Sequence, residues 1–228
     1  MSDIIIHRDI VQGTDEWRAV RMSKITASIV KSLLTGTYKI SKDKKITLLA
    51  YDLAAERITG RTTDTFVSFD MQRGHMEEPI ARELYEQASG NKVEQVGFIE
   101  SGFIGFSPDG LVGDDGIIEI KSVQQKFQIK AFAENEIPPQ HVAQIQTGLL
   151  VSGRQWCDFI QYSNGMPLFV KRMERDEEII QNIVTAALEF EMTIKNIIAQ
   201  YREHSAGVIV ADYIEPMPAN FFEPTEEE

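Results

Sequence analysis

The most constraining feature of this sequence is a change of pattern near residue 90. Before that point, four segments have the spacing of helices, with Thr14 and Thr26 as N-caps and Gly36 and Gly60 as stops. These helical segments cover residues 15–22, 27–36, 44–60 and 77–90, and the last one begins at Glu77 or further back near Phe69. A proline at position 79 is expected only in a first turn or at a kink.

Strand patterns dominate after that point. Apolar runs at 92–100 and 103–107 flank Ser101-Gly102, and a turn at 113–116 leads into an alternating strand that ends at residue 122. A helix follows Pro138-Pro139, and two further strands form a hairpin around Asn164-Gly165, a pair typical of a type I′ turn. An amphipathic helix covers 176–204. This order predicts an α/β sandwich in which helices flank a mixed central sheet.

The composition excludes several classes of protein. Of the 228 residues, 43% are apolar and 25% charged, which is ordinary for a soluble globular protein with one sizeable core. The sequence contains no run of 18 apolar residues, so no transmembrane helix is expected, and the N-terminus has no signal-peptide pattern. The single cysteine, Cys157, excludes internal disulfides and four-cysteine metal sites, and we expect it to serve in packing. A reducing cytoplasm fits these features.

The charge is distributed unevenly along the chain. A net charge of −12 and a pI of about 4.9 argue, taken alone, against a nucleic-acid partner. However, residues 1–50 carry a net charge of +4, whereas residues 51–170 and 171–228 each carry −8. An acidic protein with such a basic front can still present a basic groove, because the electrostatic field is local.

Two carboxylates and a lysine are expected to share one patch. Asp109 lies in the turn Ser107–Gly110, while Glu119 and Lys121 are two residues apart on the next strand and therefore point to the same face. The hairpin between them brings Asp109 to within about one register step of Glu119. Two hard oxygen donors suit Mg²⁺ or Mn²⁺, and a nearby lysine can position a water molecule, so the set suffices for metal-assisted phosphodiester hydrolysis.

A structural explanation stands beside this chemical one. Pro-Asp-Gly is an ordinary turn sequence, and a glutamate and a lysine two apart often form a solvated strand face. Each motif alone is therefore weak. The two at hairpin spacing are more specific, because they require both strands and a turn of the right length.

Further candidates come from two helices. Glu78 lies four residues before Arg82 and shares a helix face with it, although the neighbouring Glu77 could play the same part and spacing does not choose between them. Gln144 can hold a water or a phosphate oxygen, with His141 three positions earlier on the same face. Each has a structural alternative. Glu78 and Arg82 could form an exposed ion pair of little energetic weight, Gln144 could be an ordinary exposed glutamine, and His141 could be a surface or capping residue.

A basic and aromatic set occupies the front of the chain. Arg21 can bind a phosphate through its guanidinium fork, and Ser28 lies in the first turn of a helix, where an anion is favoured. Lys44 and Lys45 are candidates for contacts with backbone phosphates. The alternative interpretation makes Trp17 a core residue and the cations solvated.

Six motifs in this order resemble the phage lambda exonuclease family, which is also called the YqaJ-like viral recombinase family. These are Trp17 with Arg21, Ile25–Ser28, Arg73-Gly74 with Glu78-Pro79, Ser107–Gly110, Glu119–Lys121 and Ala143-Gln144. The resemblance covers roughly residues 12–172. It implies a restriction-endonuclease-like fold with a Pro-Asp…Glu-x-Lys core, forming a single nuclease domain over 1–228. The helix at 176–204 and the acidic tail at 223–228 carry no transferred role.

The resemblance implies a metal-dependent 5′→3′ exonuclease that degrades one strand of double-stranded DNA. It assigns Asp109, Glu119 and the Ile120 carbonyl to metal coordination, with two Mg²⁺ ions expected and Mn²⁺ as an alternative. Lys121 would position the attacking water, Glu78 would hold a metal-bound water, and Gln144 would orient the nucleophile or the scissile phosphate. The residues implied for the 5′-terminal phosphate are Arg21, Ser28, Ser107 and Trp17.

Partners and origin follow from the same resemblance. It implies a substrate with a 5′-phosphorylated end, 3′ single-stranded tails for annealing-type recombination, a single-strand annealing protein as partner and a ring-shaped trimer. A phage or prophage protein in the cytoplasm of a bacterial host is expected, without a membrane. Two alternatives remain: an endonuclease of the same fold, and an inactive DNA-binding or scaffold protein. Ser122-Val123 departs from many members, which have a small residue and a proline there.

Overall fold

A computed structural model describes residues 3–62 and 69–214. The predicted acidic tail at 223–228 lies outside the described residues. The helices are α1 (Asp15–Arg21), α2 (Ala27–Leu33), α3 (Lys45–Thr59), α4 (Phe69–Ser89), α5 (Gln125–Glu134), α6 (Pro139–Ser152) and α7 (Glu177–His204). The strands are β1 (Ile4–His7), β2 (Ile25–Thr26), β3 (Val93–Glu94), β4 (Phe98–Ser101), β5 (Ile104–Phe106), β6 (Gly110–Val112), β7 (Gly116–Ser122), β8 (Trp156–Tyr162) and β9 (Phe169–Glu174).

The strands form two sheets rather than one central sheet. One has the order β1-β4-β5-β2, and the other has the order β3-β6-β7-β8-β9. In the second sheet β7 pairs antiparallel with β6 and parallel with β8, and β8 and β9 form the predicted antiparallel hairpin. The predicted α/β class with mixed strands flanked by helices is therefore confirmed.

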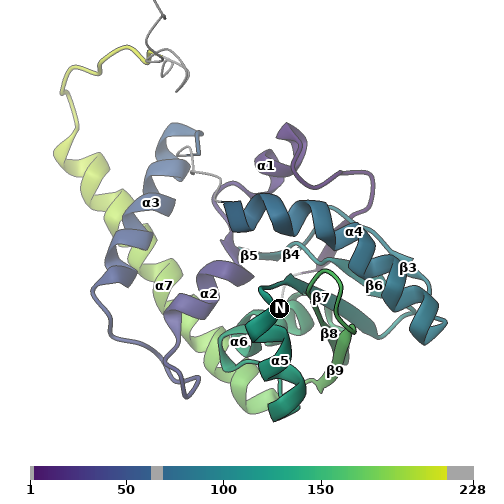
Figure 1. Cartoon of the computed structure of the whole chain (residues 1–228). Coiled ribbons are helices and arrows are strands. Elements are labelled where there is room, and N and C mark those ends of the chain that lie inside the picture. Colours follow the sequence, from purple (N-terminus) through teal and green to yellow (C-terminus); the bar gives the residue numbers. More distant parts are fainter. Residues whose placement is uncertain (1–2, 63–68, 215–228) are drawn as a thin grey trace, which may run out of the picture.

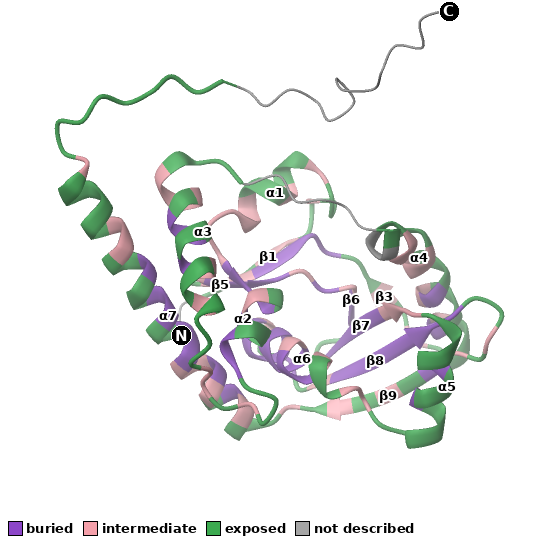
Figure 2. Cartoon of the chain, turned by 60° about the vertical axis from the view of Figure 1, so that its left-hand side comes forward, coloured by how far each residue is buried: buried purple, intermediate pink, exposed green. Residues whose placement is uncertain are grey.

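Helices cover both faces of the five-stranded sheet (Figure 1). On one face α4 packs through Ala81 and Tyr85 against Ile118 and Ile120 of β7. On the other face α6 contributes Ile145 to a core that spans both sheets. Figure 2 shows β7 and β8 as buried strands at the centre of the molecule. The central strand β7 thus runs between two helices, each of which can bring side chains to its ends.

A second helical layer lies beyond α6. Helix α7 packs against α2, α3 and α6, and its inner face is apolar as the sequence predicts. One buried residue on that face is charged: Glu191 forms a bidentate ion pair with Arg57 of α3 at 3.0 and 2.8 Å. None of the described helices is long and apolar enough to span a membrane.

The predicted helix boundaries hold in part. Thr14 caps α1 through its side chain, and α3 ends at Gly60 in a left-handed conformation. In contrast, α2 ends at Leu33 rather than at Gly36, because Leu34 is already extended and forms a bridge with Ile40. Thr26 occupies the N-cap position of α2 but makes no capping bond.

Two further local predictions are wrong. The segment 92–100 is not one strand, because the chain crosses between sheets at Gly97, where a Cβ would lie 2.3 Å from the Ile10 carbonyl oxygen. The turn at Asn164-Gly165 is not type I′, since only Gly165 has a positive φ. Helix α4 begins at Phe69, the earlier of its two predicted starts, so Pro79 lies inside the helix rather than in its first turn. Helix α5 had no predicted counterpart.

Candidate active site

The predicted pair of carboxylates meets where β6 begins and β7 ends. Gly110 pairs with Ile118 in the antiparallel register, so Asp109 lies one step further along, beside Glu119. The Asp109 carboxylate accepts a hydrogen bond from the backbone N–H of Ile120 at 2.6 Å. Burial raises the pKa of Asp109, although Lys121 and this N–H oppose the shift. The expected juxtaposition of the two acids is confirmed.

Glu119 is buried, and its two carboxylate oxygens have different surroundings. Its side chain is 1% exposed. The Oε1 atom accepts a hydrogen bond from Gln144 Nε2 at 2.6 Å and pairs with Lys121. The Oε2 atom has no partner among the described residues. Burial raises the pKa of Glu119 to about 7, with Lys121 opposing and Asp109 adding to the shift. A buried acceptor without a donor is unfavourable unless a cation or water completes the site.

Lys121 supplies the local positive charge. Burial lowers the pKa of Lys121, but the carboxylates of Glu119, Asp109 and Glu78 more than offset this and raise it above the ordinary value for lysine. Lys121 is therefore protonated at neutral pH and acts as a charged hydrogen-bond donor.

The structure distinguishes the two adjacent acids of α4. The Glu78 carboxylate pairs with Arg82, and its pKa is raised to about 7 by burial and by the nearby Asp109. The Glu77 carboxylate instead accepts a hydrogen bond from Ser122 Oγ, on the side of Arg73. Glu78 is thus the α4 carboxylate that joins the group formed by Asp109, Glu119 and Lys121.

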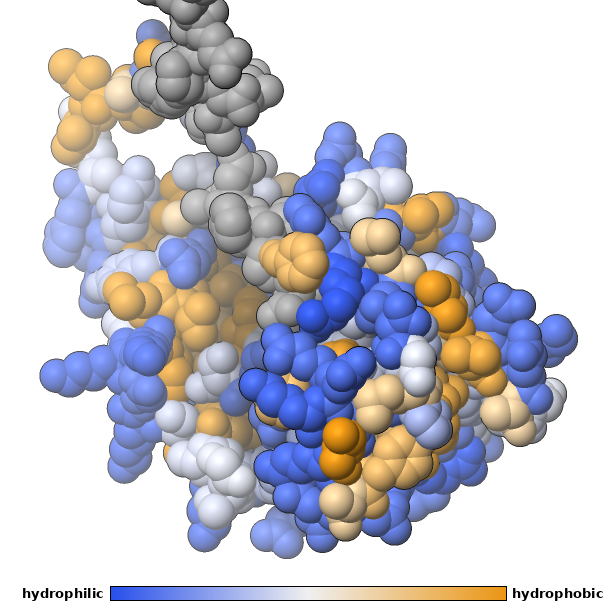
Figure 3. All heavy atoms as spheres, viewed as in Figure 1, coloured by the Kyte–Doolittle hydropathy of each residue, from blue (hydrophilic) through white to orange (hydrophobic). Residues whose placement is uncertain are grey.

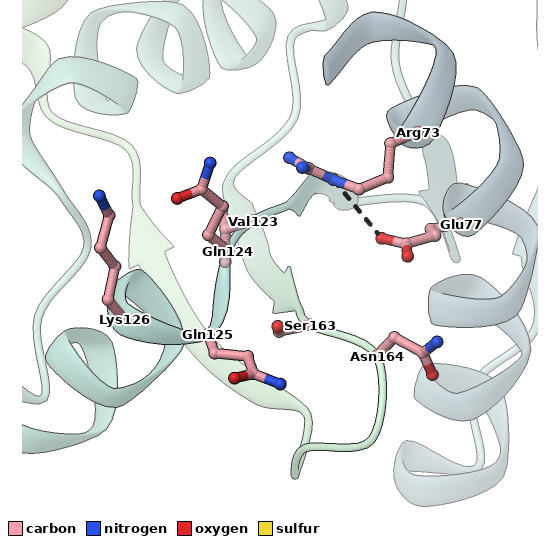
Figure 4. Close-up of a pocket in the computed structure, with 8 residues that line it drawn as sticks. All are labelled: Arg73, Glu77, Val123, Gln124, Gln125, Lys126, Ser163 and Asn164. Carbon is pink, nitrogen blue, oxygen red and sulfur yellow. Dashed lines mark ion pairs between the residues drawn. The ribbon is translucent and has the colours of Figure 1, made fainter. Parts of the chain in front are cut away.

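A hollow of about 460 Å³ lies beyond the end of β7, and none of the four residues of this group lines it. Val123, two residues after Lys121, is part of its lining, and the hollow lies between α4 and the start of α5 (Figure 4). Its lining residues are Arg73, Glu77, Val123, Gln124, Gln125, Lys126, Ser163 and Asn164. The lining combines two cations, the Glu77 carboxylate that pairs with Arg73, amides and a hydroxyl with an exposed apolar area, so it is mixed in character.

A second cavity has a more apolar lining. It lies between α3 and α7 and is lined mainly by Tyr51, Ala54, Ala55, Ile58, Ile197 and Tyr201. In Figure 3, hydrophobic side chains gather over these two helices. Most of its lining is apolar, and although Thr59, Gln200, His204 and Ser205 also line it, it contains no carboxylate among the described residues to hold a metal ion.

Three of the predicted phosphate-binding residues, Trp17, Arg21 and Ser107, form a separate Arg21 cluster at the end of β5. Trp17 Nε1 donates to Ser107 Oγ at 3.0 Å and is also within bonding distance of the Gly97 carbonyl at 3.1 Å. Arg21 donates to the same hydroxyl at 3.3 Å and stacks over the Trp17 ring at 3.9 Å. Burial lowers the pKa of Arg21 to about 10, against the effect of Glu56, so it stays cationic at neutral pH. The alternative of Trp17 as a core residue is wrong, since it is only half-buried.

Not all of the predicted binding residues join this cluster. Ser28 is exposed and pairs with Thr26 Oγ1 at 2.9 Å. Its helix has only seven residues, so a helix dipole contributes little there. Lys44 and Lys45 lie exposed at the start of α3, and the structure brings neither of them into contact with the two clusters.

The comparisons with known proteins identify the family. The model of the YqaJ-like viral recombinase domain matches residues 16–155. The chain belongs to this family. Over 124 residues it is 32% identical to the uncharacterized protein YqaJ of Bacillus subtilis (strain 168), a match that covers 51% of this chain and 39% of that protein.

Solved structures agree with this assignment. The alkaline exonuclease LHK-Exo of Laribacter hongkongensis superposes with a TM-score of 0.78 at 34% identity, covering 86% of this chain and all of that one. LHK-Exo has also been solved in complex with dAMP. A phage-related exonuclease from Haemophilus somnus 129PT shares the fold, with a TM-score of 0.57 at 14% identity. The fold is restriction-endonuclease-like.

The donor set of this YqaJ-like site fits a hard divalent cation that retains water. Within the described residues, no group of three or more acidic, histidine or cysteine side chains is close enough to enclose a metal by itself. Mg²⁺ does not require such a cage, since it usually keeps several waters and binds one or two carboxylates plus substrate phosphates. Asp109 and the unpartnered Oε2 of Glu119 offer such a pair.

Two residues near the site make contacts that the sequence analysis did not predict. Arg82 contacts the Asp109 main chain as well as Glu78, which a helical spacing does not reveal. His141 is neither a surface nor a capping residue: it is half-buried, and its ring stacks on Phe159 with centroids 5.2 Å apart. Burial, with Lys121 and Lys31, lowers the pKa of His141 to about 4, so it is neutral at physiological pH. Its position three residues before Gln144 was the available signal.

Proposed function

We propose that this protein is a metal-dependent 5′→3′ exonuclease acting on double-stranded DNA ends. The observation that carries the proposal is the connection between its two polar clusters. Ser107, in the Arg21 cluster, and Asp109, in the carboxylate group, are separated by one residue, Pro108. In extended chain two residues span about 7 Å, which is of the order of one nucleotide step along a strand. A terminal phosphate held at Arg21 would therefore put the next phosphodiester near the carboxylates.

The family resemblance assigns roles to Asp109, Glu119, Lys121, Glu78 and Gln144, and the unpartnered Oε2 of Glu119 supports the metal site. Asp109, the Oε2 atom of Glu119 and the Ile120 carbonyl would hold two Mg²⁺ ions, or Mn²⁺ in their place. When bound, such a cation stabilises charge on the phosphate and activates water as a nucleophile. Lys121 would position that water, Gln144 would orient it or the scissile phosphate through its amide, and Glu78 would hold water beside the ions.

The Arg21 cluster supports recognition of a 5′-terminal phosphate. A terminal phosphate carries more charge than an internal one, and a half-buried guanidinium stacked on Trp17 can read that difference. Ser107 is already bonded to both residues, and Ser28 would add a hydroxyl. Lys44 and Lys45 would contact the duplex further from the end.

The product and its receiving partner follow from the 5′→3′ direction of degradation. Removal of the 5′ strand leaves a 3′ single-stranded tail, which a single-strand annealing protein would receive for recombination. The complex of LHK-Exo with dAMP supports release of mononucleotides. We also propose a ring-shaped trimer around the duplex and action in the cytoplasm of a bacterial host, with a phage or prophage origin.

One digestion experiment tests this proposal. Linear duplexes with a phosphate on only one 5′ end are incubated with Mg²⁺ or with EDTA, beside nicked and covalently closed circles. We expect resection only from the phosphorylated end, only with Mg²⁺, and loss of the end preference in Arg21→Gln. Cleavage of the closed circle would support an endonuclease instead, and binding without cleavage would support a scaffold role.

A further inference from the structure

Arg82 makes contacts that an ordinary helix surface pair does not make. Its side chain is 12% exposed, and its guanidinium binds two different elements. The Nε–H donates to the main-chain oxygen of Asp109 at 3.1 Å, while Nη2 donates to the Glu78 carboxylate within α4. One side chain thus ties α4 to the turn that presents Asp109.

We infer that Arg82 is a positioning residue that fixes Asp109 and Glu78 relative to each other for metal binding. The inference rests on the metal site of the proposed function, to which it adds a residue that contacts neither the reacting atoms nor the cation. Its geometric basis is a pair of hydrogen bonds to Asp109. Arg82 donates to the main-chain oxygen, and the Ile120 N–H donates to the Oδ2 atom. Among the described residues, Asp109 Oδ1 and Glu78 Oε2 receive no hydrogen bond that would compete with a cation.

The chain itself offers a comparison for this pair. Lys130 and Glu134 on α5 are also four residues apart, but they lie 3.7 Å from each other and are 64% and 56% exposed. Exposed pairs of that kind contribute little to stability and hold neither side chain in place. The Glu78–Arg82 pair differs in its burial and in the third group, the Asp109 carbonyl, which it holds.

The shape of arginine is essential to the argument. The guanidinium is a rigid planar fork whose nitrogens serve two acceptors at once, whereas a lysine ammonium is a point charge on a flexible stem. Lysine at position 82 would preserve the charge near Glu78 but not the simultaneous contact with the Asp109 carbonyl. Charge and bridging are therefore separable by Arg82→Lys.

The experiment uses the full chain and two readouts. Arg82→Met, Arg82→Lys and the matched control Lys130→Met are compared with the natural protein. Hydrogen exchange in EDTA follows the peptide covering Ser107–Val112, and calorimetry measures Mn²⁺ affinity. We expect exchange in this peptide at least threefold faster and Mn²⁺ affinity at least tenfold weaker in both Arg82 variants, and neither change in Lys130→Met.

The outcomes distinguish a failure of the positioning role of Arg82 from a failure of the proposed metal site. Unchanged exchange and affinity in Arg82→Met would overturn the inference, as would full affinity in Arg82→Lys. If Arg82→Met does not fold, Arg82→Lys alone decides. If the natural protein binds no Mn²⁺, the proposed metal site fails, while the exchange measurement still tests whether Arg82 holds the Asp109 turn.

Discussion

Replacing Glu119 by glutamine should make the metal-free protein more stable. Burial raises the pKa of Glu119 from 4.5 to about 7, so its ionised form is unfavourable in the folded state. At about 1.4 kcal/mol per pH unit, this difference corresponds to roughly 3 kcal/mol at pH 8. For a chain of this size such a gain raises Tm by about 6–12 °C. Glutamine preserves the size of the side chain and the acceptor for Gln144.

The sign of the pH dependence follows from the same shift. The folded-state pKa is above the unfolded one, so ionisation of Glu119 costs stability fully above pH 7. Below about pH 4.5 the carboxyl group is protonated in both states, and the advantage of glutamine disappears. Added Mg²⁺ should raise the Tm of the natural protein by binding the folded state, and should not do so for Glu119→Gln.

Thermal unfolding at pH 8 and pH 4.5, in EDTA and separately in Mg²⁺ without EDTA, measures these effects. The matched control is Glu134→Gln, because Glu134 is an exposed helical glutamate whose loss should change Tm little. A Tm for Glu119→Gln at pH 8 no higher than that of the natural protein would refute the reasoning. An equal gain at pH 4.5 would refute it as well, since it would not come from the charge.

Two further predictions concern packing near the site. In Gly105→Ala, the new Cβ would lie 2.0 Å from the Phe98 ring, so we expect a loss of about 1–3 kcal/mol in urea unfolding; wild-type stability would contradict the close contact. Arg172 donates two hydrogen bonds to the buried Asp158 carboxylate, at 2.8 and 2.9 Å. Arg172→Met should lower the free energy of unfolding by about 1–3 kcal/mol in the same assay, because the buried carboxylate then keeps only its hydrogen bond from Tyr85. A cost that persists unchanged in Asp158→Asn would show that the ion pair is not its source.

The carboxylate pair was predictable because it depends on short-range rules. The two-residue period of a strand puts Glu119 and Lys121 on one face, and a hairpin of fixed length sets Asp109 beside them. The helix containing Gln144 was visible from its flanking prolines and apolar pattern. Neither inference required knowledge of how distant segments pack.

Contacts between distant segments were not predictable in this way. The choice between Glu77 and Glu78 depends on the rotation of α4 over β7, and Arg82 reaches Asp109 only in the packed structure. The split of the strand at Gly97 arises from the approach of the Ile10 carbonyl, 87 positions earlier in the chain. Local sequence patterns carry no signal for such approaches.

The most direct test of the account is whether Asp109 is required for hydrolysis of a DNA end. Nucleotide release from a 5′-phosphorylated linear duplex is measured with Mg²⁺ for the natural protein, Asp109→Asn and the control Asp114→Asn, which changes an exposed turn residue close in the chain. We expect release by the natural protein and by Asp114→Asn, and at least a thousandfold slower release by Asp109→Asn. Equal release by Asp109→Asn would contradict the assignment of the carboxylate group as the hydrolytic site.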